Sequence, residues 1–340
     1  MLTVAAFGCR SRDAHPIEQH PKATATTNAD ATAAFTKDQA ACTTGIMMAC
    51  VRLGSYYENG SGVAKDVIKA ASFFQQGCTG GEMVGGQALG RLYEAGVGVT
   101  QDASKAAALF LQACTGENME SCASLGHLYA SGNGVFQSSS KAATFYKQAC
   151  TGGVFSSCVN LGISYERAEG VALDIAQAAE LYEHACSGGA MQGCVTLGIL
   201  FATGNGVAKD EARAAGLYQQ ACTGGIPLAC GLLAAAYIAG AGVAQNDSKG
   251  VALLQQACAG ADSTSCFTLG LSYEAGIGVA ENLAKAAAAY QQSCTGQYAE
   301  GCYNLGIFYQ EGTGVTQDVA KSVKLFRQAC KGGFVKACPR

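Results

Sequence analysis

The chain contains few charged residues and no cluster of basic ones. Asp, Glu, Lys and Arg make up 14% of its 340 residues, against about 25% in an ordinary soluble protein, and the net charge is −3. Binding of nucleic acid or an anionic membrane by charge is therefore excluded. The apolar run over residues 231–244 is shorter than the roughly 18 residues that indicate a membrane span. We expect a buried helix there and no transmembrane segment.

Histidine is also scarce, with four residues in the whole chain. The sequence contains no H-E-x-x-H, no C-x-x-C-H and no G-x-x-x-x-G-K-[ST] motif. It gives no support to a zinc protease, a c-type cytochrome or a P-loop protein. We therefore expect no metal ion and no cofactor.

Cysteine, in contrast, occurs 18 times and at a fixed spacing. One series recurs every 36 residues, and a second series follows it by eight residues. A constant period over most of the chain predicts a solenoid built from one repeated unit. Paired cysteines in the units indicate an oxidising compartment. Only Gly86 breaks the second series, which leaves Cys78 without a partner at this spacing.

Other positions of the 36-residue frame predict two helices in each unit. Residues 50, 53, 54 and 57 of the first unit are Cys, Leu, Gly and Tyr, and this spacing forms one face of a first helix. The glycine on that face indicates that a neighbouring helix comes too close for a Cβ. The helix is followed by a Gly-Val pair in every unit, beginning with Gly62, where glycine permits a positive φ after a helix.

The second helix begins after a residue that can cap its free N–H groups. The capping residues are Asp66, Asp102, Ser138, Asp174, Asp210, Asn246, Asn282 and Asp318. Small residues and one large apolar residue follow, as two tightly packed antiparallel helices require. The chain is therefore predicted to be all-α, a superhelical α/α solenoid of eight helix-turn-helix repeats over residues 44–331. A capping helix is expected at 30–43 and a partial repeat at 332–340.

The segment Ser138-Ser139-Ser140-Lys141 matches the S-x-x-K motif of serine β-lactamases. Ser138 stands at the capping position, and Lys141 stands where most other units have Lys or Arg, so the repeat alone produces the match. The S-D-N and K-T-G partner motifs are missing. We therefore assign no catalytic residue.

The cysteine pairs are predicted to form disulfides. Eight residues of continuous helix rise about 12 Å, whereas the Cα atoms of a disulfide lie within about 7 Å, so a turn must separate the two cysteines. Zinc sites use shorter spacings and four ligands. We expect the bonds Cys42–Cys50, Cys114–Cys122, Cys150–Cys158, Cys186–Cys194, Cys222–Cys230, Cys258–Cys266, Cys294–Cys302 and Cys330–Cys338.

The pattern L-G-x-x-Y-x-x-G-x-G-V-x-x-D-x-x-K-A-A-x-x-Y-x-x-A-C, read for example from Leu89 to Cys114, resembles the Sel-one-like repeats, relatives of the tetratricopeptide repeats. The cysteine pairs resemble the Helicobacter cysteine-rich protein family. That resemblance implies secretion and, for some members, penicillin binding or weak β-lactamase activity. A more distant likeness to a mitochondrial intermembrane-space assembly factor implies redox or haem handling.

Residues 1–29 are interpreted as a truncated lipoprotein signal and a polar tether. An apolar stretch precedes Cys9, with Ala6 and Gly8 at the −3 and −1 positions of a lipobox, although Leu is more usual at −3. We expect Cys9 to be lipidated and Cys78 to be a free thiol. Without lipidation, the tether is long enough to allow a Cys9–Cys78 bond instead.

The function that this pattern favours is that of a non-catalytic, monomeric scaffold outside the cytoplasm of a bacterium. In the related repeats the first helices line the concave side, and side chains beside the conserved stripe would bind a peptide or protein, including a cell-wall peptide. The candidate ligand-binding residues are Arg52, Arg91, His127, Asn160, Arg167, Asn304 and Glu311. A penicillin-binding or β-lactamase-like hydrolase and a redox or haem-handling factor stay open as alternatives.

Overall fold

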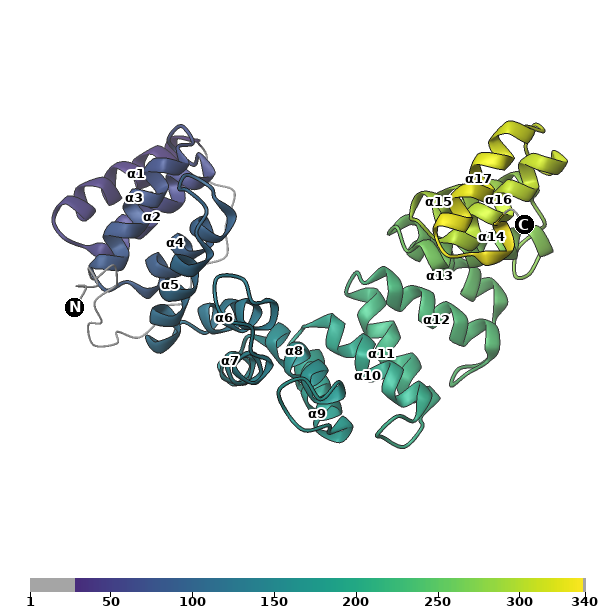
Figure 1. Ribbon diagram of the computed structural model, residues 1–340, viewed down its shortest axis with the longest axis horizontal. Coiled ribbons are helices and arrows are strands. Elements are labelled where there is room, and N and C mark those ends of the chain that lie inside the picture. The colour runs from purple at the N-terminus through teal and green to yellow at the C-terminus, as the bar shows by residue number, and fades with distance from the viewer. Residues whose placement is uncertain (1–27, 339–340) are drawn as a thin grey trace. The chain divides into compact units, whose positions relative to one another are not determined.

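The computed structural model describes residues 28–338, which divide into two compact units, one ending at Leu173 and the other beginning at Asp174. This described part contains seventeen α-helices and no strand, as the sequence pattern predicts (Figure 1). Unit 1 holds α1 (Asn28–Thr43), α2 (Met47–Asn59), α3 (Val67–Thr79), α4 (Met83–Ala95), α5 (Ala103–Thr115), α6 (Met119–Ser131), α7 (Ser139–Thr151) and α8 (Phe155–Glu166).

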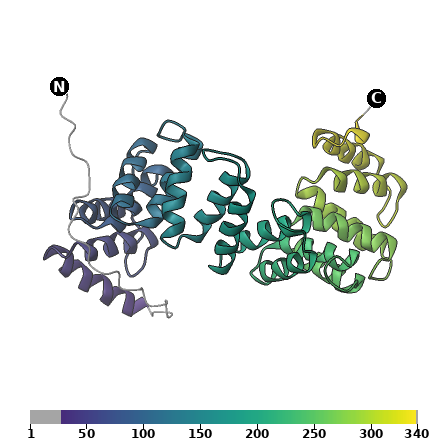
Figure 2. The same ribbon diagram turned by 90° about the horizontal axis from the view of Figure 1, so that it is seen from below.

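Unit 2 is built in the same way and ends in a short 3-10 turn where the sequence predicts the start of another repeat. It holds α9 (Ile175–Ser187), α10 (Met191–Thr203), α11 (Glu211–Thr223), α12 (Pro227–Ala239), α13 (Asp247–Ala259), α14 (Ser263–Ala275), α15 (Leu283–Thr295), α16 (Ala299–Glu311), α17 (Val319–Lys331) and η1 (Val335–Ala337). Within each unit a helix packs against the helices that precede and follow it in the chain (Figure 2).

In six of the eight repeats the glycine of the first helix lies against the aromatic ring of the helix that follows it. A Cβ on Gly90 would come within 2.7 Å of the Phe110 ring, and a Cβ on Gly126 within 2.6 Å of the Tyr146 ring. Phe110 is fully buried and Tyr146 is only 5% exposed. The sixth repeat has Ala234 at the glycine position and Leu254 in place of a ring. The predicted close approach is thus confirmed, and the partner is a side chain.

The loop glycines meet a second constraint. Gly98 has a φ of +71°, and a Cβ there would lie 2.3 Å from the carbonyl oxygen of Val67. Val67 begins α3, the second helix of the preceding repeat. The loop of one repeat therefore rests directly on the helix start of the repeat before it, which explains why this column contains only glycine.

The predicted capping residues all cap their helices. In each second helix from α3 to α17, the side-chain oxygen of the capping residue accepts a hydrogen bond from the backbone N–H three residues later, at 2.9 to 3.4 Å. Ser138 is one of them and caps α7. The S-x-x-K match therefore coincides with a helix cap.

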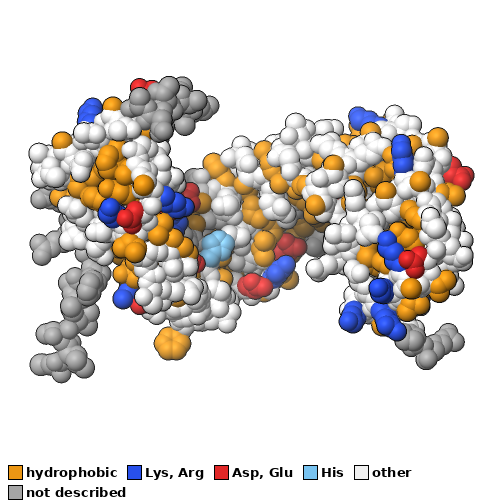
Figure 3. Space-filling model, turned by 90° about the horizontal axis from the view of Figure 1, so that it is seen from above, with side chains coloured by type: hydrophobic (Ala, Val, Ile, Leu, Met, Phe, Trp, Pro, Cys, Tyr) orange, Lys and Arg blue, Asp and Glu red, His pale blue; other side chains and the backbone are white. Residues whose placement is uncertain are grey.

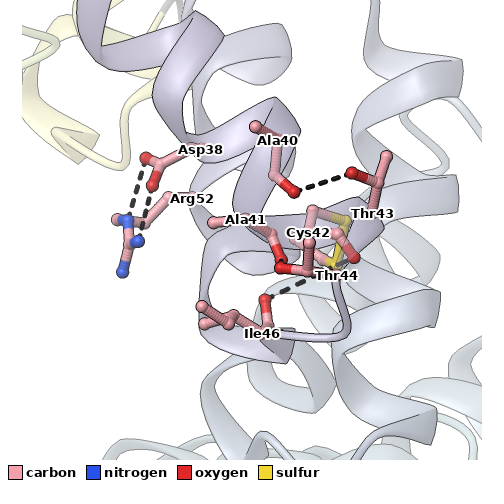
Figure 4. Close-up of a disulfide and its surroundings, with 9 residues drawn as sticks. Asp38, Ala40, Ala41, Cys42, Thr43, Thr44, Ile46 and Arg52 are labelled. Carbon is pink, nitrogen blue, oxygen red and sulfur yellow. Dashed lines mark hydrogen bonds and ion pairs between the residues drawn. A yellow bond between two sulfur atoms is a disulfide. The ribbon is translucent and has the colours of Figure 1, made fainter.

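The eight predicted disulfides are confirmed. Six of them close the turn between the second helix of one repeat and the first helix of the next, one joins α1 to α2, and the last joins α17 to the residue after η1; the bonded Cα atoms are 4.5 to 4.9 Å apart. Figure 4 shows the bond between Cys42 and its partner at the turn from α1 to α2. In the chain-entropy description each such short loop contributes about 2–3 kcal/mol.

The prediction of a free thiol at Cys78 is wrong, because Cys78 is disulfide-bonded in the structure. The free thiol was expected because Gly86 stands where the nearest partner would be and because Cys9 was expected to be lipidated, while a bond to Cys78 stayed open as the alternative. A cysteine at a buried helix end can form a disulfide with a cysteine that is not the nearest one in the sequence. The predicted lipidation site, Cys9, lies outside the described residues.

Replacing Asp210 by Ala is expected to destabilise its repeat by about 1 kcal/mol, because the first turn of α11 loses its cap. Asn246→Asp is the matched control and should be almost neutral, since Asp and Asn cap equally well. Denaturant unfolding of the oxidised protein measures both changes. Equal losses for the two variants would contradict the capping role.

Candidate functional site

Charged side chains are sparse on the surface. Figure 3 shows a face on which uncharged atoms predominate and acidic and basic groups lie close together in small sets. Two of the predicted ligand-binding residues, Arg52 and Arg91, form ion pairs within the chain.

Arg52 and Arg91 both bind acidic residues of unit 1. The Arg52 guanidinium donates to both carboxylate oxygens of Asp38, at 2.9 and 2.5 Å, and Tyr56 donates to the same carboxylate at 3.1 Å (Figure 4). The hydrogen bonds from Arg52 hold the pKa of buried Asp38 below its usual value. Arg91 approaches Glu58 at 3.8 Å. Arg52 therefore anchors the capping helix and is not free to clamp a ligand carboxylate.

Three other predicted residues do not join a common site either. Arg167 is the exposed C-terminal cap of α8. Glu311 ends α16 and accepts a hydrogen bond from Thr313 at 3.4 Å. Asn304 is hydrogen-bonded to Tyr290, so it belongs to the packing of unit 2.

The remaining pair, His127 and Asn160, lies together. The His127 ring joins α6 to its neighbours, since its Nδ1 is 3.1 Å from the Tyr146 hydroxyl and its Nε2 is 3.4 Å from the Asn160 amide nitrogen. The His127 and Tyr146 rings meet edge to face at 5.3 Å. Since an amide nitrogen only donates, Nε2 accepts, and Nδ1 carries the proton and donates to Tyr146.

Tyr146 and Asn160 border a hollow with a volume of about 400 Å³. It is bounded by α6, α7, α8 and their loops, and its lining residues are Ala130, Gln137, Ser139, Ala142, Tyr146, Asn160, Ile163, Ser164 and Glu169. Ligand pockets in proteins start at roughly 300 Å³. The hollow is therefore large enough for a side chain or another small group of a ligand.

The corresponding position of unit 2, four repeats further along, is filled. There Glu274 replaces Ala130 and accepts a hydrogen bond from the Tyr290 hydroxyl. Phe308 replaces Ser164 and packs edge to face on Tyr290, with ring centres 5.4 Å apart. Burial and the bond to Glu274 raise the pKa of Tyr290 far above its usual value. Beside Tyr146 two small residues thus stand where the position around Tyr290 has large ones.

Two loop residues make this part of unit 1 unlike the other repeats. Phe136 directly precedes Gln137 of the hollow and is 97% exposed, whereas the same position is Ala or Thr in the other seven repeats. Ala168 directly precedes Glu169 and has a φ of +55°, a left-handed conformation that usually requires glycine. The other seven repeats have glycine at this position after the first helix, with φ between +67° and +79°, so Ala168 keeps the conformation of the repeat without the residue that suits it best.

The sequence reasoning missed Tyr146, Glu169 and Phe136. Phe136 could have been found as the one bulky residue in a column of Ala and Thr. Tyr146 lies in the column of large apolar residues, and only the structure shows that its hydroxyl reaches a hollow. Glu169 occupies a column of variable loop residues, so the sequence gives no signal for it.

The basic residue near the start of each second helix has a structural role that the sequence did not reveal. In seven of the eight repeats it lies 4.0 to 5.4 Å from the centre of the aromatic ring of the first helix: Lys69 on Tyr57, Lys105 on Tyr93, Lys141 on Tyr129, Arg213 on Phe201, Lys249 on Tyr237, Lys285 on Tyr273 and Lys321 on Tyr309. Each contact contributes about 0.5–1 kcal/mol. Lys141 of the S-x-x-K match is one of them.

A comparison with known protein families gives the class of the protein. The Sel1 repeat family matches at residues 48–82, 87–118, 120–154, 156–189, 193–226, 227–262, 263–297 and 299–334. The chain therefore belongs to the Sel1 repeat family, whose arrays serve as scaffolds for protein–protein interaction. No curated protein matches the chain.

The chain is similar to several solved structures. A protective antigen of uropathogenic Escherichia coli with the same repeat fold is 27% identical, with a TM-score of 0.78 over 89% of this chain, which spans 65% of that protein. A Sel1 repeat protein from Oxalobacter formigenes is 22% identical, with a TM-score of 0.64, and the match covers 72% of this chain and 96% of that one. Helicobacter pylori cysteine-rich protein B is 31% identical over 40% of this chain and 97% of its own, with a TM-score of 0.32.

The disulfides indicate that the chain folds in an oxidising environment outside the cytosol. Among residues 28–338, each helix is too short or too polar to cross a membrane.

Burial, together with the negative charge of Glu169, raises the pKa of Tyr146 from 10.0 to about 12. We predict that Glu169→Gln lowers this pKa while leaving it above 10, because burial remains. Carbon-13 NMR of labelled tyrosine rings during a pH titration measures the change. Tyr218, whose pKa is raised by burial alone, is the control and should not respond. An unchanged Tyr146 titration in the variant would show that Glu169 is not close to the hydroxyl.

Proposed function

We propose that the protein is a non-catalytic scaffold outside the cytoplasm and that it binds a peptide or protein partner at the hollow of unit 1. The observation that carries this proposal is the open position above Tyr146, where the equivalent Tyr290 of unit 2 is covered by Glu274 and Phe308. The helices α6 and α8 that border it are first helices of their repeats, which line the concave side in tetratricopeptide-like arrays.

The exposed ring of Phe136 supports binding of a macromolecule. Aromatic residues are enriched among the few side chains that contribute most to protein–protein affinity. A fully exposed Phe has no packing role within its own chain, and here it is adjacent to a residue that lines the hollow. The hollow and Phe136 together offer a partner one pocket and one apolar contact.

The polar residues of the hollow fit recognition better than covalent chemistry. His127 is engaged with both Tyr146 and Asn160, so it fixes the direction of these two side chains. Ser138 caps α7 and Lys141 lies on the Tyr129 ring. The side chains that could suggest a hydrolase are thus occupied by structural contacts.

Site-specific photocross-linking tests the proposal. A benzoylphenylalanine at position 136 should cross-link to a discrete partner when the purified protein is mixed with extracellular and envelope extract. The same photoreactive residue in place of Ala208, an exposed position of the same loop column in unit 2, is the matched control and should give no such product.

The hollow is tested separately by Ala130→Glu in the protein that carries the photoreactive residue at 136. The new carboxylate copies Glu274 and should cover Tyr146, so that the cross-link to the partner disappears. Ala202→Glu, the same change at the equivalent residue two repeats further along, should leave the cross-link unchanged. Equal cross-linking from positions 136 and 208, or insensitivity to Ala130→Glu, would contradict the proposed site.

A further inference from the structure

The hydrogen bonds around the hollow leave mainly oxygen acceptors for a ligand. Gln137 uses its amide nitrogen to donate to the Ala130 carbonyl at 2.8 Å, and Ser164 donates to the Asn160 carbonyl at 3.1 Å. The amide nitrogen of Asn160 faces His127 at 3.4 Å. The amide oxygens of Gln137 and Asn160 and the carboxylate of Glu169 are left as acceptors, and the hydroxyls of Tyr146 and Ser139 can accept as well as donate.

The charge of the lining residues also favours a ligand that donates hydrogen bonds. Glu169 carries the one charge among the described residues that border the hollow, and no Lys or Arg lies among them. Its negative charge adds to the effect of burial in raising the pKa of the Tyr146 hydroxyl. A carboxylate beside several amide and hydroxyl oxygens is complementary to a group that carries positive charge and several N–H donors.

We propose that the hollow of unit 1 binds the guanidinium or ammonium head of a basic side chain, an Arg or Lys that the polypeptide partner inserts. The head would lie against Glu169 and the amide oxygens of Gln137 and Asn160. Ala142 and Ile163 give the methylene stem an apolar wall. His127 is a positioning residue, since it lies outside the lining of the hollow and contacts both Tyr146 and Asn160. This inference rests on the proposed function and adds the chemistry of the ligand.

Nuclear magnetic resonance of the full chain with labelled Asn and Gln side chains tests the inference with defined probes. N-acetylarginine amide should shift the side-chain amide signals of Asn160 and Gln137 in a saturable way. N-acetylcitrulline amide has nearly the same shape without the charge and should bind at least about tenfold more weakly, because the charge-assisted bonds to Glu169 are lost. Methylguanidine, a free cation without a peptide group, should also bind more weakly than the arginine amide.

Glu169→Gln keeps the size of the side chain and should bring the affinities for the arginine and citrulline amides together. Glu120→Gln, a change at an exposed carboxylate that does not line the hollow, is the control and should keep the tenfold preference. Ala130→Glu should abolish the response to all three probes. Far-ultraviolet circular dichroism checks that each variant remains folded.

Equal affinity for the arginine and citrulline amides in the unchanged protein would overturn the inference, as would an Asn160 signal that does not respond to arginine amide. Methylguanidine binding as tightly as the arginine amide would overturn the part that concerns a polypeptide. In each of these cases the cross-link at position 136 and its loss in Ala130→Glu would still stand or fall independently, so the two proposals can fail separately.

Discussion

The contact between the glycine of a first helix and the ring of the following second helix determines the rest of the structure. Because the ring occupies the space of the missing Cβ, as Tyr146 does at Gly126, the two helices pack at one fixed distance and offset. The same register repeats with a period of 36 residues. The Tyr146 ring that borders the hollow stands at one of the positions that this contact places.

The ring position also decides where polar groups enter the array. Phe110 fills it without any polar atom and is fully buried, whereas Tyr146 and Tyr290 carry a hydroxyl to the edge of the packed layer. In unit 2 the hydroxyl binds Glu274, and in unit 1 it borders an open hollow. In the capping helix, Asp38 takes the same position and binds Arg52. The same position of the repeat thus anchors the capping helix through Asp38, forms a closed contact at Tyr290 and borders the candidate binding site at Tyr146.

Sequence periodicity predicted the framework well, because each framework contact recurs in every repeat. The helix pairs, the caps from Asp66 to Asp318 and the eight disulfides all follow from columns. The candidate site was harder to predict, because it depends on departures from the columns. Of the seven residues proposed from sequence, His127 and Asn160 come together, while Arg52 is used in the chain's own packing. The prediction of a free thiol at Cys78 failed for the same reason, because the disulfide of Cys78 does not follow the repeated spacing of eight residues.

Hydrogen–deuterium exchange gives the most direct test of the claim that unit 1 has an open site where unit 2 has a filled one. Exchange of the full chain would be measured by mass spectrometry with and without the partner that cross-links at position 136. The account predicts that the partner slows exchange in residues 127–169 and leaves the corresponding residues 271–313 unchanged. Protection confined to 271–313, or equal protection of both segments, would contradict it.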